Sequence, residues 1–397
     1  MRSGPVTAAL ISLLYTLLIF LIAWYAHHRK QIGRSIVGNP YVYCLSIAVY
    51  CSTWTFYGSV GKAATTGIDF LIIYLGPSLT AFSWFFLLRR IIRISKENNI
   101  TSIADFISLR YGKSLWLGAL VTFIAILGIM PYIALQIKAV STSFYLISGL
   151  SSEIFVIPHF DTVLSLPTGL LLTIILSVFS VIFGARRLVS SERHEGLVAA
   201  VAFESLVKLA SMFTVGLFVT YGLFDGFSDL FTRFQTQRPE LFTQLFTLGN
   251  VGKNPDYIPS FTMLFMSMGA IMLLPRQFHV MVIENSDEKH ITKAMWLFPA
   301  YLFLINLFVM PIAMGGILTT GSNSGADFFV ISVPLAVGNN AIAMLAFLGG
   351  LSAAAGMVMV ESVAISTMLL NHIFMPIIMH FTPQSWFPTL LINLKRT

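Results

Sequence analysis

The residues best suited to chemistry in this chain are small and hydroxyl-bearing side chains within residues 49–67, VYCSTWTFYGSVGKAATTG. They lie inside a long apolar stretch and have two explanations. They can let membrane helices pack closely and hydrogen-bond to one another. Alternatively, they can mark a discontinuous helix whose unwound backbone binds a solute or a cation. The small and hydroxyl residues are Ser52, Thr53, Thr55, Gly58, Ser59 and Gly61.

Four ionisable side chains also lie within apolar stretches, where charged groups commonly have a function. Glu204 and Lys208 are four residues apart, so they share a helix face and can form a structural ion pair, or act in gating or proton coupling. Lys138 can reach a carbonyl or extend to the membrane interface. Glu361 has no local partner. It is a candidate proton-linked carboxylate, or it faces a polar cavity without taking part in coupling.

The remaining residues that could react or bind a metal do not predict a separate site. Pro275 interrupts the helical ladder beside Arg276, which we interpret as a topology anchor. His279 has no second histidine or cysteine at metal-ligand spacing, so we expect no metal other than sodium. Cys44 and Cys51 are seven residues apart, which rules out a disulfide inside one regular helix.

The composition indicates that membrane-spanning helices hold these side chains. The chain has 397 residues, of which 56% are hydrophobic and only 10% are charged, whereas soluble domains carry about 25% charged residues. The mean hydropathy is +0.81. We therefore expect a multi-pass protein of a bacterial-type inner (plasma) membrane, in contact with the lipid bilayer. The net charge of +7 comes from basic loops, so it does not predict nucleic-acid binding.

The apolar runs predict nine membrane spans, since each span needs about 20 apolar residues. Most of the 24 basic residues fall in one set of loops, so the positive-inside rule places the C-terminus inside and the N-terminus outside. The long last span has room for a break near Gly349. The expected spans are residues 5–27, 40–61, 67–89, 115–149, 165–185, 194–224, 257–283, 292–319 and 334–380.

Two segments between spans also show helical patterns. Residues 97–112 predict a short helix at the inner membrane surface, with Thr101 or Ser102 as its cap and Asp105 in its first turn. The loop 225–256 predicts either an amphipathic interfacial helix or an external lid.

Five stretches spread over most of the chain carry a resemblance to a known family. Together they resemble the sodium/solute symporter family. Within it, they are most similar to a subgroup that forms the membrane part of nutrient-responsive sensor histidine kinases. The stretches are YCSTWTFYGSVG (50–61), PYIALQIKAVSTSF (131–144), FGARRLVSSERHEGLVAAVAFESLVKL (183–209), LPRQFHVMVIEN (274–285) and GLSAAAGMVMVESVAIS (350–366).

The resemblance implies an all-α polytopic membrane protein with the five-plus-five inverted-repeat transporter fold. One extra helix precedes the core in this family. Residues 1–39 then hold this extra transmembrane helix and a cytoplasmic linker, and 40–224 the five core helices of the first inverted repeat. Residues 225–256 form the external loop, and 257–397 an incomplete second repeat of about three core helices.

The resemblance also implies a sodium site between the first and eighth core helices. In the family, backbone carbonyls of the first helix and hydroxyls of the eighth hold the ion. The matching carbonyls here are those of Ala48 and Cys51. The hydroxyl positions fall on Ala355 and Gly356, which have no side-chain oxygen, and Ser352 lies one turn earlier as a substitute. The implied sodium site is therefore degenerate, and no other cofactor is expected.

Solute is expected at the broken segments of the first and sixth core helices. Half-helix ends offer amides for a carboxylate and carbonyls for an amine, which suits a small amino acid or carboxylate. Trp54 and Tyr57 can close such a pocket, or be packing aromatics. The implied substrate-binding residues are Ser52, Thr53, Trp54, Tyr57, Ser267 and Gly269.

The chain shows no kinase signature, so we expect no enzyme activity from it. The main hypothesis is the membrane input module of a sensor histidine kinase, which recognises or transports a small nutrient such as an amino acid. Its partners are then that solute and C-terminal kinase domains in the full-length protein. The alternative is a stand-alone cation-coupled solute symporter. Because two core helices of the second repeat are missing, we expect a fragment or a truncated chain.

Overall fold

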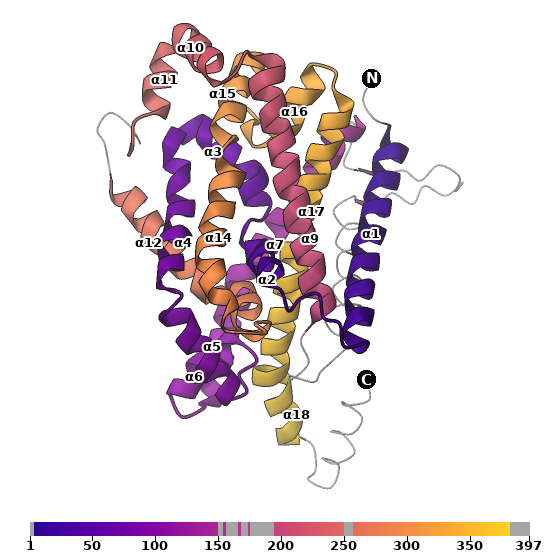
Figure 1. Ribbon diagram of the computed structural model, residues 1–397, viewed down its shortest axis with the longest axis vertical. Helices are drawn as coiled ribbons and strands as arrows, with labels where there is room; N and C mark the ends of the chain where they lie inside the picture. Colours follow the sequence, from indigo (N-terminus) through magenta and orange to yellow (C-terminus); the bar gives the residue numbers. More distant parts are fainter. Residues whose placement is uncertain are drawn as a thin grey trace.

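The computed structural model describes residues 4–149, 194–249 and 257–381, together with residues 154–155, 166–167 and 174 (Figure 1). The described chain is almost entirely helical, and its strands β1 (Ile154–Phe155) and β2 (Leu166–Pro167) form a short antiparallel pair. Six described helices are long and apolar enough to cross a membrane, or seven if one bent pair counts as a single span. These helices support the predicted multi-pass membrane protein.

The helical segment from residue 40 to residue 66 is broken, as the discontinuous-helix hypothesis predicts. Helix α2 (Pro40–Ile47) begins where the Asn39 side chain accepts the Tyr41 N–H. It ends in the 3₁₀ helix η1 (Ala48–Tyr50), after which Cys51 is extended, with φ −78° and ψ 92°. Helical structure resumes in the π-helix η2 (Trp54–Gly58) and α3 (Ser59–Thr66).

A second break separates α12 (Ile258–Leu273) from α13 (Pro275–Phe278). Proline has no N–H to donate and disfavours helical geometry in the residue before it. Leu274 is accordingly extended, with φ −63° and ψ 134°. The two sides of this break, α12 and the helix formed by α13 with η6 (His279–Ile283), meet at a bend of 48°.

The remaining helices surround these two broken elements. Before the first break lies α1 (Pro5–Gln31). Between the breaks lie η3 (Gly67–Leu71), α4 (Ile72–Ser83), α5 (Leu87–Glu97), α6 (Ile103–Arg110), α7 (Leu115–Ser148), α9 (Glu195–Leu217), η5 (Phe218–Leu223), α10 (Phe227–Gln237) and α11 (Pro239–Leu245). After the second break lie α14 (His290–Asn306), α15 (Val309–Thr320), η7 (Ala326–Phe328), α16 (Phe329–Ala336), α17 (Asn340–Leu369), η8 (Leu370–Phe374) and α18 (Met375–Phe381).

Helix α17 packs along α9 and α7, and α1 packs against α9 at the edge of the bundle (Figure 1). Glycines allow such close approaches between helices, including one between α17 and η2. A Cβ on Gly196 of α9 would lie 2.7 Å from the Ala23 carbonyl oxygen of α1. A Cβ on Gly350 of α17 would lie 1.8 Å from Tyr57 Oη. Helix α17 is continuous across Gly349, so the predicted break there is wrong, and small residues serve helix packing instead.

Three further expectations have different outcomes. Ser102 caps α6 by accepting the Asp105 N–H, as predicted. The described part of the loop 225–256 forms α10 and α11, which pack on α15 and α3. Most of the expected span 165–185 lies outside the described residues.

Candidate functional site

Polar side chains of α7 close the first break. Ser52 Oγ lies 2.5 Å from Tyr132 Oη. Gln136 Oε1 accepts the Thr53 N–H at 3.0 Å and the Thr53 hydroxyl at 2.6 Å. Gln136 is fully buried, so it satisfies an amide that the break leaves without a helical partner. The predicted residues Ser52 and Thr53 thus lie in the break, with their polar groups bonded to α7.

On the other side of the break, two backbone carbonyls face Lys208 of α9. Lys208 Nζ donates to the Ala48 oxygen at 2.6 Å and to the Cys51 oxygen at 2.7 Å. These are the two carbonyls that the family resemblance assigns to a sodium ion. Lys208 is only 3% exposed. Its buried ammonium group therefore supplies the positive charge that these carbonyl oxygens face.

Glu204 lies one helical turn before Lys208 but does not bond to it. Neither carboxylate oxygen of Glu204 has a hydrogen-bond partner among the described residues. Its Oε2 packs against α17, where a Cβ on Gly356 would lie 2.6 Å away. The predicted direct ion pair is therefore wrong, because Lys208 reaches across to the broken helix. The Glu204 carboxylate instead fills space at a position where the resemblance calls for a hydroxyl.

Helix α17 does not supply the missing sodium ligands. The Ser352 hydroxyl is hydrogen-bonded to the Tyr15 hydroxyl of α1 and donates to the Leu348 carbonyl at 2.9 Å. Ala355 is buried and has no side-chain oxygen. With Lys208 on the two carbonyls and Ser352 bonded to α1, the residues at this position do not fit a sodium ion.

The second break carries a buried ion pair to α17. Arg276 Nη1 lies 2.9 Å from Glu361 Oε2, and the two side chains are 3% and 0% exposed. The guanidinium also lies over the Tyr132 ring, 5.0 Å from its centroid. This corrects one interpretation from the sequence, because Arg276 is buried in the bundle instead of anchoring a loop at the membrane surface. Glu361 has no partner near it in the sequence, and its partner in the structure is 85 positions away.

The two breaks contact one another. Gln277 Nε2 of α13 donates to the Ile47 carbonyl at the end of α2, at 3.3 Å. A second connection runs from Ser52 through Tyr132 to Arg276. Polar groups of both breaks, of α7 and of α17 therefore form one network inside the bundle.

The two aromatic residues predicted to close the solute pocket differ in burial. Trp54 is half-buried, and its ring lies 6.4 Å from the ring of Tyr74. Tyr57 is 2% exposed and packs against Gly350 of α17. Trp54 therefore keeps part of its surface accessible, whereas the contacts of Tyr57 are those of a packing residue.

The other predicted residues lie away from the first break. Ser267 donates to the Leu264 carbonyl at 2.8 Å and packs against α4, where a Cβ on Gly76 would lie 2.0 Å from its hydroxyl. Gly269 is half-buried in the same helix, α12, and Lys138 is exposed on α7. Within the described ranges, neither Ser267 nor Lys138 donates a side-chain hydrogen bond to the first break.

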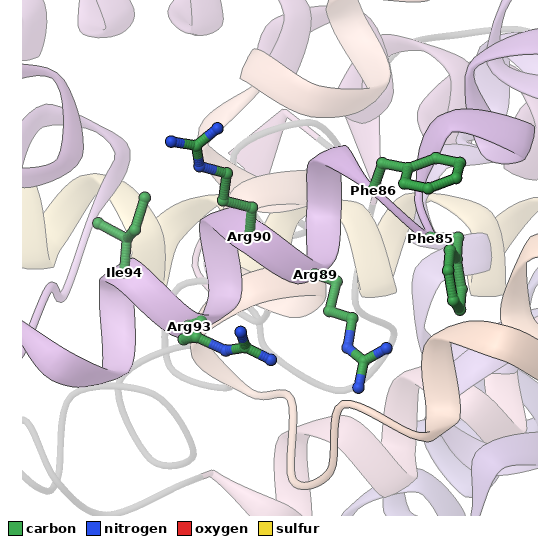
Figure 2. A pocket seen from close by; sticks show the side chains of 6 residues that line it. All are labelled: Phe85, Phe86, Arg89, Arg90, Arg93 and Ile94. Carbon is green, nitrogen blue, oxygen red and sulfur yellow. The ribbon is translucent and has the colours of Figure 1, made fainter.

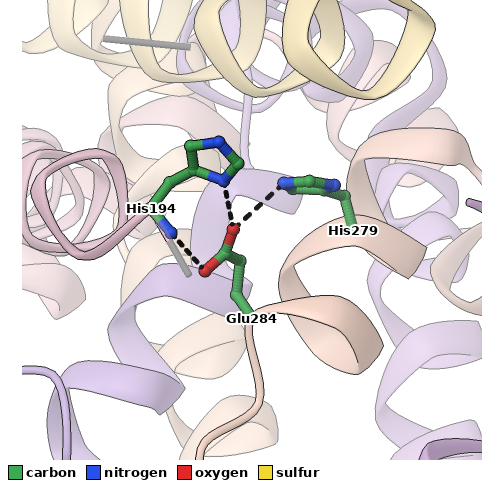
Figure 3. A group of neighbouring side chains, drawn as sticks. All are labelled: His194, His279 and Glu284. Carbon is green, nitrogen blue, oxygen red and sulfur yellow. Dashed lines mark hydrogen bonds and ion pairs between the residues drawn. The ribbon is translucent and has the colours of Figure 1, made fainter. Parts of the chain in front are cut away.

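A cluster that the sequence did not predict joins the second break to the start of α9 (Figure 3). His194 Nδ1 lies 2.8 Å from Glu284 Oε1, and the backbone N–H of His194 donates to Glu284 Oε2 at 3.0 Å. His279 Nε2 lies 3.2 Å from the same Oε1. Burial raises the pKa of Glu284, but the hydrogen bonds from His194 and the close approach of His279 outweigh this and hold the pKa well below its ordinary value.

The same three side chains offer ligand atoms that lie within 4.8 Å of one another, a grouping that could also hold a divalent metal ion. Metal-ligand spacing along the sequence did not reveal it, because His194 and Glu284 are 90 positions apart.

An open hollow lies on α5 and is lined by Phe85, Phe86, Arg89, Arg90, Arg93 and Ile94 (Figure 2). None of these residues belongs to either break. Arg89 and Arg93 also pair with Glu288, at 3.1 and 3.2 Å. Aromatic and basic side chains together are typical of a membrane–water interface, so we do not assign this hollow to the solute.

Comparisons with known proteins find two relatives that are described as symporters. No family model matches the chain. It is 24% identical over 296 residues to the uncharacterized symporter YhjB of Bacillus subtilis (strain 168), a match that covers 75% of this chain and 55% of the relative. It is 27% identical over 146 residues to the uncharacterized symporter YodF of the same organism, covering 34% of this chain and 29% of the relative. The homologues of this chain are symporters.

A solved structure supports the same fold. A Na⁺-coupled sialic acid symporter, in a substrate-bound outward-open state, matches with a TM-score of 0.63 and 15% sequence identity over 92% of this chain and 74% of that chain. The described protein therefore has a symporter-type membrane fold. The matched region of this chain spans about half the length of YhjB and less than a third of YodF.

These findings favour the stand-alone symporter over the sensor-kinase module. The link to sensor histidine kinases rests on sequence resemblance alone. The all-helical membrane fold is confirmed, whereas the number of spans and their orientation stay predictions.

Proposed function

We propose that this chain forms the core of a secondary transporter that carries a small polar solute across the membrane by symport with a cation. The observation that carries the proposal is the meeting of two broken helices inside the bundle, where Gln277 bonds to the Ile47 carbonyl. Interrupted helices are tolerated at membrane depth only where protein or a polar cavity satisfies the freed backbone groups. Paired breaks of this kind are typical of solute sites in transporters.

The residues around the breaks suggest the chemistry of the solute. Trp54 offers an aromatic face, and the Ser52 and Tyr132 hydroxyls offer donors and acceptors. Arg276 is held beside them, with its charge balanced by Glu361. This set suits a small amino acid or a short carboxylate.

The test is uptake of radiolabelled amino acids and short carboxylates into vesicles that contain the full-length protein. Ser52→Ala and Trp54→Ala should each lower uptake by roughly tenfold or more, which corresponds to about 1.4 kcal/mol of binding or barrier energy. The melting temperature should change little. The matched control is Trp116→Ala, because Trp116 is 88% exposed on α7. Equal losses of uptake and of folded protein in Ser52→Ala and Trp54→Ala would favour the packing interpretation and overturn the proposed roles of these residues.

The sensor hypothesis uses the same solute site and differs in its output. It is favoured by the resemblance of residues 183–209 and 274–285 to sensor membrane domains. The gene beyond residue 397 distinguishes the two functions. A continuing frame with a dimerisation helix and an ATP-binding domain supports the sensor, and further membrane spans alone support the stand-alone symporter.

A further inference from the structure

The ammonium group of Lys208 occupies the position of a bound cation. It lies between two backbone carbonyls of the broken helix, 2.6 Å from the Ala48 oxygen and 2.7 Å from the Cys51 oxygen. Both carbonyls lie where the helix stops, and a carbonyl at a helix end carries a partial negative charge. Lys208 comes from α9, so its side chain also ties the broken helix to the bundle.

The surroundings of this ammonium group include one acidic side chain. Glu204 lies one turn away on the same helix, and both of its carboxylate oxygens lack hydrogen-bond partners in the described chain. In its ionised form, Glu204 would stabilise the Lys208 ammonium group electrostatically even without direct contact. The other titratable groups that face the pair are Tyr15 of α1, the Cys51 thiol, and Arg276, whose charge is balanced by Glu361.

We propose that Lys208 is a tethered cation that permanently replaces sodium in this protein, so that solute binding and transport need no sodium at this site. The family resemblance implies a sodium ion there, and the side chains present do not fit one. The carbonyls already have a cationic partner, and Ala355 and Gly356 offer no hydroxyls. The inference about transport rests on the proposed function, whereas the inference about ion binding does not.

A tethered ammonium group differs from sodium in one functional respect. Sodium stabilises the closed arrangement of the broken helix only when it is bound, so its concentration gradient can drive transport. Lys208 is covalently attached, so its contacts with Ala48 and Cys51 do not depend on ion concentration. Any coupling ion must therefore act at another place in the protein.

The ion-binding test compares the melting temperature of the purified full-length protein in NaCl and in KCl at equal ionic strength. Wild type should show no difference between the two salts. Lys208→Ala removes the ammonium group and leaves the two carbonyls facing the space that the lysine side chain filled. This variant should gain a sodium-specific rise of roughly 2 °C or more, because a ligand that binds only the folded state stabilises it. Lys138→Ala, which removes an exposed lysine, is the control and should gain none.

Lys208→Ser is the second variant. The hydroxyl of the introduced serine adds an oxygen ligand, so the sodium-specific rise in melting temperature should be larger than in Lys208→Ala. A sodium-specific stabilisation of wild type as large as that of Lys208→Ala would overturn the proposal, because the lysine would then not occupy the sodium position. A folded Lys208→Ala or Lys208→Ser protein that does not respond to sodium would also overturn it.

Uptake of the radiolabelled amino acids and carboxylates separates this proposal from the proposed function. Wild-type uptake should be equal in sodium and in potassium medium. Wild-type uptake that rises more than tenfold with sodium, with the same sodium dependence in Lys208→Ala, would overturn the tethered cation and leave symport intact. Absence of uptake of every solute in both media would overturn the proposed function, and the melting-temperature comparison would still decide whether sodium binds.

Discussion

Arg276 and Glu361 form an ion pair that is buried between the second break and α17, with 2.9 Å between Arg276 Nη1 and Glu361 Oε2. Removing one partner of a buried pair leaves an uncompensated charge and costs roughly 3–5 kcal/mol, whereas replacing both partners costs much less. The pair therefore fixes α13 against α17. It also holds the guanidinium over the Tyr132 ring, next to the first break.

Glu361→Gln should destabilise the protein more than the double variant with Arg276→Gln, because only the single variant leaves a buried charge alone. We expect the melting temperature of the purified protein to fall by several degrees in Glu361→Gln. The double variant should recover at least half of this loss. Equal losses in both proteins would show that the two charges are not coupled.

Gln136→Leu should weaken the first break. The substitution nearly preserves side-chain size but leaves the Thr53 N–H and hydroxyl without their shared acceptor, at roughly 1–3 kcal/mol for each buried donor. Amide hydrogen exchange in peptides that contain Thr53 should become faster. Adding Thr53→Val removes one of the two unsatisfied donors and should restore part of the stability. Unchanged exchange in Gln136→Leu would contradict this role of Gln136.

The second break could be predicted from the sequence because its cause is local. Pro275 lacks an N–H whatever it packs against, and the residue before it becomes extended. The small and hydroxyl residues around Ser52 were compatible with close packing as well as with an interruption, and the family resemblance favoured the interruption. The cap at Ser102 also depends only on a neighbour three residues away.

The partners of the buried charges could not be predicted in this way. Helical periodicity tells which residues share a face, but not which helix that face meets. It therefore pointed from Lys208 to Glu204, four residues away, whereas the lysine bonds to carbonyls 160 and 157 positions earlier. A long flexible side chain can reach beyond its own helix face, and here it bonds to two carbonyls that carry partial negative charge at the broken helix end.

Gly350→Ala should disrupt the contact between α17 and the broken helix. Its new Cβ would lie 1.8 Å from Tyr57 Oη, so one of the two helices must shift. The matched control is Gly128→Ala in α7, where a Cβ would meet nothing within 4 Å. That change should be neutral or stabilise the helix by roughly 0.5–1 kcal/mol. Similar melting temperatures for the two variants would show that Tyr57 can move away from a Cβ on Gly350 at little cost in stability.

Glu284 should make the stability of the protein depend on pH. Burial raises the pKa of this carboxyl, but the hydrogen bonds from His194 and the close approach of His279 hold it well below the ordinary 4.5. A group whose folded-state pKa is depressed stabilises the protein fully above its unfolded pKa, and this contribution is lost as pH falls toward the folded value. Glu284→Gln should therefore melt below wild type near pH 7, and the difference should shrink as the pH falls below about 4.5.

Two further variants test whether this difference arises from the charge of Glu284. Glu97 is exposed at the end of α5, so Glu97→Gln should leave the melting temperature unchanged at each pH. His279→Ala removes one partner of the Glu284 carboxylate, so adding Glu284→Gln to it should cost less near neutral pH than in wild type. A constant difference between wild type and Glu284→Gln across this pH range would show that Glu284 acts through its shape. The carboxylate would then not be the group that holds the second break to the start of α9.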